Sequence, residues 1–340
     1  MSFTRALLIS LALLLVMLIL SVAIGPVWIP PGTVLSLLAG RLAGDLPTQA
    51  AGIFATILFE IRLPHALLIV LTGAALAGSG ASYQGLFRNP LADPYLIGVA
   101  SGAGLGAVIA MSIRWPADLL GLYVIPAAAF AGALVTVMLV YSLARYGKSL
   151  PTTTLILAGV AISSFATSLT SFLMLRSNEE LRRATGWLLG GSLMSGWQPV
   201  LAVLPYMLIG LAVLVTSGHA LNVLQFGEEQ ASQMGLRAER VKFLLILAAS
   251  LTAASAVAFS GIIGFIGLIV PHLVRLLWGA DYRRLVPLSV ISGGSALLIA
   301  DLISRVALAP QILPVGIVTA LAGAPFFLWI LRRSKNQGYW

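Results

Sequence analysis

Long apolar runs separated by short polar turns make up most of this chain. A helix needs roughly 20 predominantly apolar residues to cross about 30 Å of hydrocarbon. Dividing the runs at charges, at Pro and Gly turns and at excess length predicts ten membrane-spanning helices, of which the eighth is short and contains Pro271 and His272. The predicted helices cover residues 6–27, 63–83, 94–113, 119–143, 152–175, 197–217, 241–262, 267–278, 285–305 and 315–331.

Composition favours lipid as the solvent for most of this surface. Of the 340 residues, 59% are hydrophobic and 9% are charged, whereas a soluble domain carries about 25% charged residues. So few polar residues cannot cover an aqueous surface, and we expect an all-α polytopic membrane protein with a single transmembrane domain over residues 1–340. The first run is longer than the apolar region of a signal peptide, so it is expected to be a retained span. Residues 28–60 are expected to form an external loop with a short helix.

The net charge of +9 is interpreted as orienting the chain in a membrane, not as binding nucleic acid. The basic residues occur singly or in twos and threes between apolar runs, as membrane-orienting charges do. With both termini in the cytoplasm, 13 of the 20 Lys and Arg residues lie inside, and the basic tail at 332–340 favours a cytoplasmic C-terminus. The remainder, expected outside, are Arg41, Arg62, Arg114, Arg176, Arg182, Arg183 and Arg305.

Several kinds of chemistry are excluded or unsupported by the residues present. The chain has no cysteine, which excludes disulfides and thiolate sites, and its three histidines lie far apart without metal-binding spacing. Gly147-Lys148-Ser149 is similar to the end of a phosphate-binding loop, but Ser142 stands where that motif requires its first glycine. No metal, cofactor or nucleotide site is therefore expected in this chain.

The fifth predicted span carries two rows of hydroxyl groups. Residues 163, 167 and 170 form one row and residues 164, 168 and 171 the other, because residues three and four apart share a helix face. Such a neutral polar wall suits a water-filled passage that must not hold its cargo tightly. The alternative is helix packing, or hydrogen bonding back to the preceding turn. The proposed passage residues are Ser163, Thr167 and Thr170.

Other polar and small residues within the apolar runs have structural explanations. Asp93 is expected to cap the third span, with Pro94 at its first position. The glycine-rich stretches 73–80 and 102–106 are expected to let helices approach closely. Asp301 and Arg305 have the spacing of a local ion pair; we expect a structural Asp301 and a surface-exposed Arg305 that faces a partner.

The longest internal hydrophilic segment, residues 225–242, is expected on the cytoplasmic side. Residues 227–236 are typical of a short helix with acidic residues in its first turn and Gly235 as its C-terminal stop. A surface helix of this length is marginal in water unless it packs against something. The segment is therefore a predicted docking site for another protein.

Five blocks of sequence stand out along the chain: IRLP at 61–64, GAALAGSG at 73–80, NPLADP at 89–94, GIIGFIGLIVPH at 261–272 and LPVG at 313–316. Together they resemble the FecCD family, which comprises permeases of type II ABC importers for ferric siderophores, haem and cobalamin. The resemblance runs from about Arg62 to Arg333 and keeps the order and spacing of the family.

The resemblance implies a ten-helix subunit like that of cobalamin importers, paired with a second copy or a close paralogue in the bacterial cytoplasmic (inner) membrane. Two cytoplasmic ATPase subunits, which would hold ATP and Mg, and an external or periplasmic substrate-binding protein complete the implied assembly.

The resemblance also implies roles for particular residues, with spans five and ten lining the passage. Gly227, Glu228, Glu229, Ala231, Gly235 and Leu236 would couple to the ATPase. Arg62, His65 and Arg305 would dock the binding protein, His65 replacing a common arginine so that docking charge is reduced or pH-dependent. The inner gate would be Ser149, Leu150, Pro151, Thr152 and Thr153.

The leading hypothesis is therefore the permease of an importer for an iron chelate, with haem and cobalamin as alternatives. An ion-coupled secondary transporter would need a titratable relay at mid-membrane, for which only Asp301 and the scattered histidines could serve. An intramembrane enzyme would need a nucleophile or metal motif, and none is found in the sequence.

Overall fold

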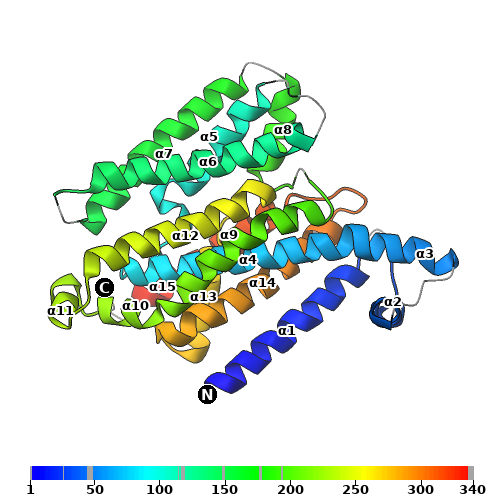
Figure 1. The fold of residues 1–340 in the computed structure, drawn as a ribbon, viewed down its shortest axis with the longest axis horizontal. Helices are drawn as coiled ribbons and strands as arrows, with labels where there is room; N and C mark the ends of the chain where they lie inside the picture. Colours follow the sequence, from blue (N-terminus) through cyan, green and yellow to red (C-terminus); the bar gives the residue numbers. More distant parts are fainter. Residues whose placement is uncertain are drawn as a thin grey trace.

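The chain folds into a bundle of helices (Figure 1). The computed structural model describes residues 2–25, 27–43, 49–113, 115, 119–147, 150–175, 178–192 and 194–335. Its elements are α1 (Phe3–Ala23), α2 (Pro31–Ala43), α3 (Gln49–Thr56), η1 (Ile57–Arg62), α4 (Leu63–Leu86), η2 (Pro94–Ile97), α5 (Val99–Met111), α6 (Leu119–Ala144), α7 (Thr152–Met174), α8 (Asn178–Leu188), α9 (Trp197–Thr216), α10 (Gly218–Leu224), α11 (Glu228–Gln233), α12 (Ala238–Ser260), α13 (Ile266–Trp278), α14 (Tyr282–Val306) and α15 (Val315–Lys335).

All ten predicted spans are confirmed as helices within the described residues. Seven helices there are long and apolar enough to cross a membrane, and three shorter apolar helices lie in α5, α13 and α15. With 13 residues each, α5 and α13 rise only about 20 Å at 1.5 Å per residue. Each follows a short non-α segment, so the chain turns inside the bundle before these two helices begin.

The second span begins earlier than expected. The sequence placed its start at Leu63, directly after the charge of Arg62, but α3, η1 and α4 form one helical run from Gln49 to Leu86. A proline inside an α-helix lacks its amide donor and clashes with the carbonyl one turn earlier. Here the preceding turn, η1, is π-helical, and its wider ring gives Pro64 room. The predicted external loop thus contains α2 and most of a second helical segment.

Glycines set the closest helix contacts, as expected from the sequence. A Cβ atom on Gly73 would collide with the backbone of Gly293 in α14, and one on Gly80 with the backbone of Gly267 in α13. Gly102 likewise lies against Gly132, where α5 meets α6. Helix α4 therefore forms the centre of the bundle, with α9, α12, α13 and α14 packed around it.

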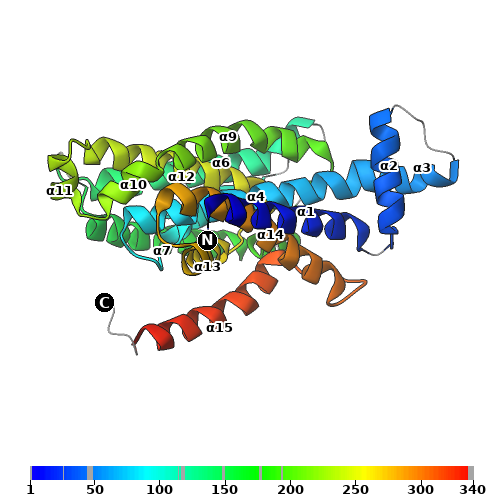
Figure 2. The same ribbon diagram turned by 90° about the horizontal axis from the view of Figure 1, so that it is seen from below.

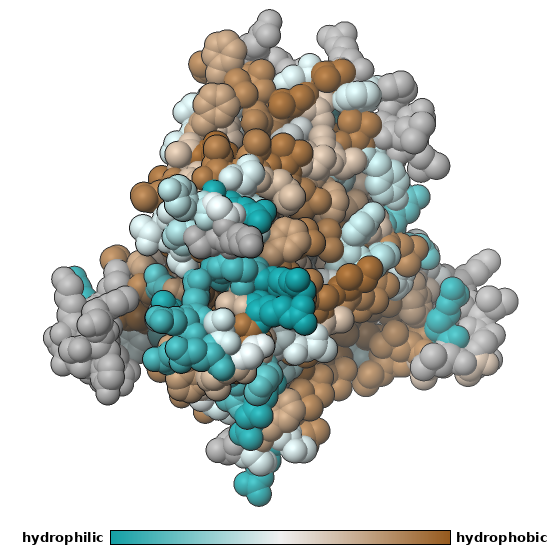
Figure 3. All heavy atoms as spheres, turned by 60° about the vertical axis from the view of Figure 1, so that its left-hand side comes forward, coloured by the Kyte–Doolittle hydropathy of each residue, from teal (hydrophilic) through white to brown (hydrophobic). Residues whose placement is uncertain are grey.

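The two ends of the bundle differ in character. Helices α2 and α3 lie at one end, and α11 lies at the other, toward which the N-terminus of α1 and the end of α15 also point (Figure 1). Figure 2 shows α15 extending away from the other helices. Figure 3 brings the α11 end forward and shows hydrophilic residues gathered there, with hydrophobic surface beyond. Large apolar side chains such as Leu8, Phe165 and Leu321 are exposed along the helices.

Candidate functional site

The hydroxyl row of α7 borders a cavity, and its role in a passage stays a prediction. Ser163, Thr167 and Thr170 line a space of about 370 Å³ together with residues of α5 and α8. Two lining residues, Tyr95 and Ser101, were missed by the sequence reasoning. Ser101 Oγ donates to Ser163 Oγ at 3.1 Å, so the hydroxyl surface continues from α7 onto α5. Only the position of Ser101 directly before the glycine-rich stretch 102–106 could have indicated this, and that stretch was interpreted as packing alone.

A second cavity adjoins the other hydroxyl row. Ser164 and Ser168 line it together with Asp93 and Tyr95. The alternative of hydrogen bonding to the preceding turn also holds for part of the stripe: Ser164 Oγ donates to the Val160 carbonyl at 2.9 Å, and Thr170 Oγ1 to the Ala166 carbonyl at 2.8 Å. These hydroxyls keep a lone pair that can face the cavity, so bonding within the helix and lining a passage are compatible.

The turn that enters α5 is built around Asp93, and the predicted cap is confirmed. The Asp93 carboxylate accepts from the Tyr95 amide at 2.8 Å, and Pro94 occupies the first position of η2. The Tyr95 hydroxyl donates to the Ile263 carbonyl at 2.9 Å. This bond joins the turn to the loop between α12 and α13, and it places the Tyr95 ring between the two cavities.

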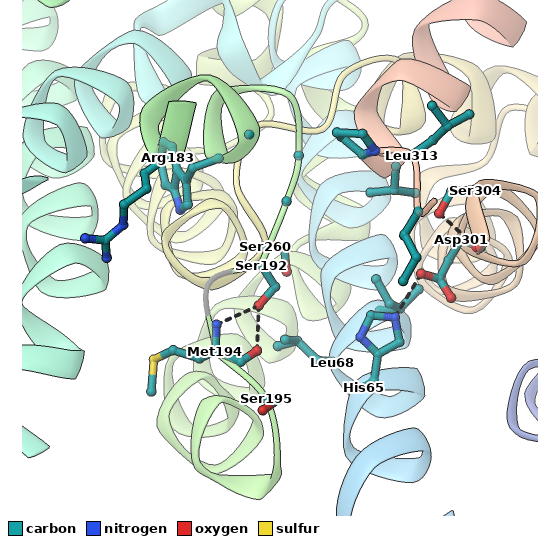
Figure 4. A pocket seen from close by; sticks show the side chains of 18 residues that line it. His65, Leu68, Arg183, Ser192, Met194, Ser195, Ser260, Asp301, Ser304 and Leu313 are labelled. Carbon is teal, nitrogen blue, oxygen red and sulfur yellow. Dashed lines mark hydrogen bonds and ion pairs between the residues drawn. The ribbon is translucent and has the colours of Figure 1, made fainter. Parts of the chain in front are cut away.

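At the opposite end from α11, charged side chains form a compact cluster. His65 Nε2 lies 2.9 Å from Asp301 Oδ1, and Arg305 Nη2 lies 2.9 Å from Asp301 Oδ2. The local ion pair expected between Asp301 and Arg305 is therefore confirmed, and α4 adds a second partner for the carboxylate. His65 and Asp301 also line a cavity of about 500 Å³ that reaches α8 and the segment before α15 (Figure 4).

The expectation that Arg305 is surface-exposed is wrong, because its side chain is only 10% exposed. Its guanidinium donates to the carbonyls of Ser21 and Ile24 at 3.1 and 3.0 Å, at the C-terminal end of α1. Carbonyl groups in the last turn of a helix lack partners within the helix and carry partial negative charge. The Arg305 guanidinium hydrogen-bonds these carbonyl groups, and its side chain therefore points into the bundle.

Arg62 is also folded inward instead of facing outward. It is 7% exposed, and its guanidinium donates to the carbonyls of Val22 and Ala23 at 2.7 and 2.9 Å and to that of Val27. Gly25 leaves the space for this contact, since a Cβ there would meet the guanidinium. The predicted docking residues thus come together around the end of α1, with only His65 partly exposed.

The predicted gate lies at the start of α7. Leu150 is buried, Pro151 is the N-cap residue, and Thr152 begins the helix. Thr153 is exposed, and Ser149 lies outside the described residues. The predicted gate residues therefore lead directly into α7, the helix that carries the hydroxyl rows.

The short helix predicted within residues 227–236 is present as α11, with the stop that was expected, while its coupling role stays a prediction. Gly235 has a φ of +86°, its amide donates to the Ser232 carbonyl at 2.9 Å, and the Leu236 amide donates to the Ala231 carbonyl at 3.0 Å. These two bonds form a Schellman motif, which requires a left-handed residue that glycine adopts at little cost. Gly227 precedes the helix as its N-cap residue. Ala231 is fully buried, whereas Glu228 and Glu229 are exposed.

A polar contact fixes the helix before α11 to the bundle. The Asn222 amide of α10 donates to Asp281 Oδ1 at 2.6 Å, and Asp281 caps α14 by accepting from the Arg283 amide at 3.0 Å. The Arg283 guanidinium and the Asn222 amide hold the pKa of the Asp281 carboxyl well below its usual range. The carboxylate therefore keeps its charge at neutral pH, and α10 stays attached to α14.

Comparisons with known proteins place this arrangement in a family. The FecCD transport family matches residues 13–333. A cobalamin import system permease protein, BtuC of Halobacterium salinarum, is 46% identical over 86% of this chain and 77% of that protein. A hemin transport system permease protein, HmuU of Yersinia pestis, is 40% identical over 82% of this chain and 84% of that protein.

A solved structure has the same fold over nearly the whole chain. It is an inward-facing metal-chelate-type ABC transporter, with a TM-score of 0.82 and 29% identity over 97% of this chain and 99% of that one. The chain therefore belongs to the FecCD transport family and is a membrane-embedded, multi-pass permease of the type II ABC importers.

Proposed function

We propose that this permease forms the passage for an iron chelate such as a ferric siderophore, delivered by an external binding protein and driven by two cytoplasmic ATPase subunits. The observation that carries the proposal is the pair of hydroxyl-lined cavities beside α7, one facing α5 and α8 and the other facing the turn at Asp93 and Tyr95. Hydroxyl groups hydrogen-bond the oxygen atoms of a chelate without holding it by charge. A bulky neutral or weakly charged cargo can then move along the wall and leave it.

The α11 end supports docking of an ATPase. Phe226 and Met234 are each 62% exposed there, and a groove beside them is lined by charged residues that include Glu228, Glu229 and Arg240. Exposed apolar side chains inside a charged rim are typical of a protein interface. In this proposal ATP and Mg bind the partner ATPase, and this permease contributes no cofactor.

The opposite end supports docking of the binding protein through Arg62, His65 and Arg305. Acidic residues on such a partner would compete with the carbonyls of α1 and with Asp301 for the two guanidinium groups. Charge complementarity of this kind sets the rate and the salt dependence of association more than the conduction step. Docking would therefore loosen the end of α1.

The exposed apolar surface supports pairing with a second copy or a close paralogue in the lipid of a bacterial inner membrane. Phe165 of α7 and Leu321 of α15 are 68% and 71% exposed, and α15 extends away from the bundle (Figure 2). Pairing along α7 and α15 would enclose the hydroxyl row of α7. The basic residues near α11 support a cytoplasmic position for this end and for both termini under the positive-inside rule.

Cobalamin is the second candidate cargo, because the BtuC relative is the more similar of the two compared. Haem is the third, on the likeness to HmuU. One experiment can distinguish these three cargoes: the permease is reconstituted in liposomes with its cognate ATPase and binding protein.

Uptake of radiolabelled ferric siderophore, haem and cyanocobalamin is measured with ATP and with a non-hydrolysable analogue. The proposal predicts ATP-dependent uptake of the ferric chelate and stimulation of the ATPase by the permease. ATP-dependent uptake of cobalamin or haem alone would overturn the assignment of a ferric chelate as cargo, but the permease would still be part of an ATP-driven importer. Uptake that follows a proton or sodium gradient without ATP would overturn the ATP-driven mechanism.

A further inference from the structure

Lys242 has a buried ammonium group near the start of α12. The residue is 3% exposed, and its Nζ has three oxygen partners that come from three different elements. They are Glu228 Oε2 of α11 at 2.8 Å, Glu239 Oε1 of α12 at 2.7 Å and the carbonyl oxygen of Leu150, before α7, at 2.9 Å. The sequence analysis counted this lysine only as an inside charge.

The ammonium group combines hydrogen bonds with ion pairs. It donates to Glu228 Oε2 and to the Leu150 carbonyl, and Glu239 adds a second ion pair. A buried cation is stable only when it is paired and hydrogen-bonded. The side chains of Glu228 and Glu239 are 43% and 40% exposed. A protein that binds at this surface can therefore contact the two acids directly and act on the buried lysine through them.

The contacts with Glu228 and Leu150 join elements with different proposed tasks. Glu228 is in the first turn of α11, and Leu150 lies two residues before the start of α7. The contact with Glu239 stays inside one helix, three residues apart. Only the first two can carry a displacement between the coupling helix and the gate.

We propose that Lys242 is a positioning residue that transmits the displacement of α11 to the gate at the start of α7, an inference that rests on the proposed function. When an ATPase moves α11, Glu228 moves with it and the ammonium group must follow or lose its partner. A shift of the ammonium group changes its bond to the Leu150 carbonyl, and with it the position of α7. Closure of the ATPase is thereby coupled to opening of the passage.

The functional test compares Lys242→Met, Lys242→Arg and Glu239→Gln in the reconstituted transporter. Methionine keeps the length of the side chain but has no donor, arginine keeps charge and donors, and Glu239→Gln weakens only the contact within α12. Losing one charge-assisted hydrogen bond shifts an equilibrium by about tenfold. We expect Lys242→Met to lower the number of cargo molecules carried per ATP by about tenfold, with ATPase activity within about twofold of the parent. Lys242→Arg restores coupling in part, and Glu239→Gln leaves it unchanged.

A second test needs no transport and uses the full-length permease alone in lipid nanodiscs. Because the chain has no cysteine, Ser232→Cys on α11 and Thr153→Cys at the gate can be spin-labelled specifically. Double electron–electron resonance then reports the distance between them. Lys242→Met should broaden this distance distribution, whereas Glu239→Gln should not. A melting curve for each variant checks that the bundle is folded.

The outcomes separate this inference from the proposed function. If the parent protein shows no ATP-driven uptake, the proposed function fails, and the spin-label distances alone decide whether Lys242 ties α11 to the gate. If the parent transports and Lys242→Met keeps the parental ratio of cargo to ATP, Lys242 is not the link. An unchanged distance distribution in Lys242→Met would overturn the inference in either case.

Discussion

His65 Nε2 lies 2.9 Å from Asp301 Oδ1, across 236 residues of sequence. Together with Arg305 Nη2, 2.9 Å from Asp301 Oδ2, it surrounds one buried carboxylate with partners from two helices. The same arginine and Arg62 bind the carbonyls at the end of α1. Helices α1, α4 and α14 are therefore joined at one end by a single polar cluster.

Removing Arg305 should destabilise the fold. Arg305→Met leaves the Asp301 carboxylate without its arginine partner, and it removes the hydrogen bonds that Arg305 donates to the carbonyls of Ser21 and Ile24. Breaking a buried ion pair costs about 3–5 kcal/mol. We expect a lower melting temperature in detergent for this variant, and a smaller loss in the double variant Asp301→Asn with Arg305→Met. Arg283→Met is the matched control, because its partner Asp281 forms an exposed pair, worth about 0–1 kcal/mol. Equal losses in the two single variants would contradict a buried role for the cluster.

Docking and stability can be separated by the choice of replacement at Arg62 and Arg305. Lysine keeps the charge but not the planar fork that holds two carbonyls, whereas glutamine loses both. The double variant Arg62→Lys with Arg305→Lys should bind the binding protein at low salt with nearly parental affinity but should have a lower melting temperature. The double variant Arg62→Gln with Arg305→Gln, called the Gln pair, should lose about tenfold in affinity, a value typical of steering charges. Surface plasmon resonance at two salt concentrations measures this, and parental affinity in the Gln pair would exclude docking.

Gly235 should tolerate asparagine better than proline. Its φ of +86° is inaccessible to proline, which holds φ near −65°, while asparagine is the side chain that most readily enters the left-handed region. An added Cβ meets no neighbour there. We expect Gly235→Pro to abolish ATP-driven uptake while the permease still reaches the membrane, and Gly235→Asn to retain most of it. Parental uptake by Gly235→Pro would show that α11 does not couple to the ATPase.

Cysteines in the hydroxyl row of α7 should report the state of the passage. Ser163→Cys, Thr167→Cys and Thr170→Cys are expected to react with a small water-soluble thiol reagent at rates that differ between the nucleotide-free and ATP-trapped complexes. Ile162, which packs against the core, is the control, and its cysteine variant should mainly reduce the yield of folded protein. If the three row positions stay unreactive in both states of an active transporter, the row serves packing.

Alanine at Gly80 should damage the fold far more than alanine at Gly40. A Cβ at Gly80 would collide with the backbone of Gly267, whereas one at Gly40 in α2 meets nothing. Overpacking a tight contact costs typically 1–3 kcal/mol, while Gly→Ala inside a free helix stabilises it by roughly 0.5–1 kcal/mol. Melting temperatures of the two variants test this difference. Equal values would mean that α4 and α13 separate without penalty.

The sequence by itself was enough to predict ten helices, because lipid requires every span to satisfy its own backbone and each span is therefore a local apolar run. Local bonds were predictable for the same reason: the Asp93 cap, the ion pair of Asp301 with Arg305, and the Gly235 stop each depend on residues within a few positions. The helical run before Leu63 was not foreseen, because the apolar run was divided at the charge of Arg62, whereas Arg62 is buried and lies inside the continuous helical run.

Only the tertiary structure decided which polar groups meet across the bundle. Lys242 and Leu150 are separated by 92 residues, and Arg305 and Ser21 by 284, so no local pattern relates them. The inward fold of Arg62 and Arg305 follows from carbonyls at the end of α1, whose position depends on how α1 packs against α14. A buried charge takes the partners that packing brings within reach, because leaving it unpaired in a medium of low dielectric costs more than any local preference.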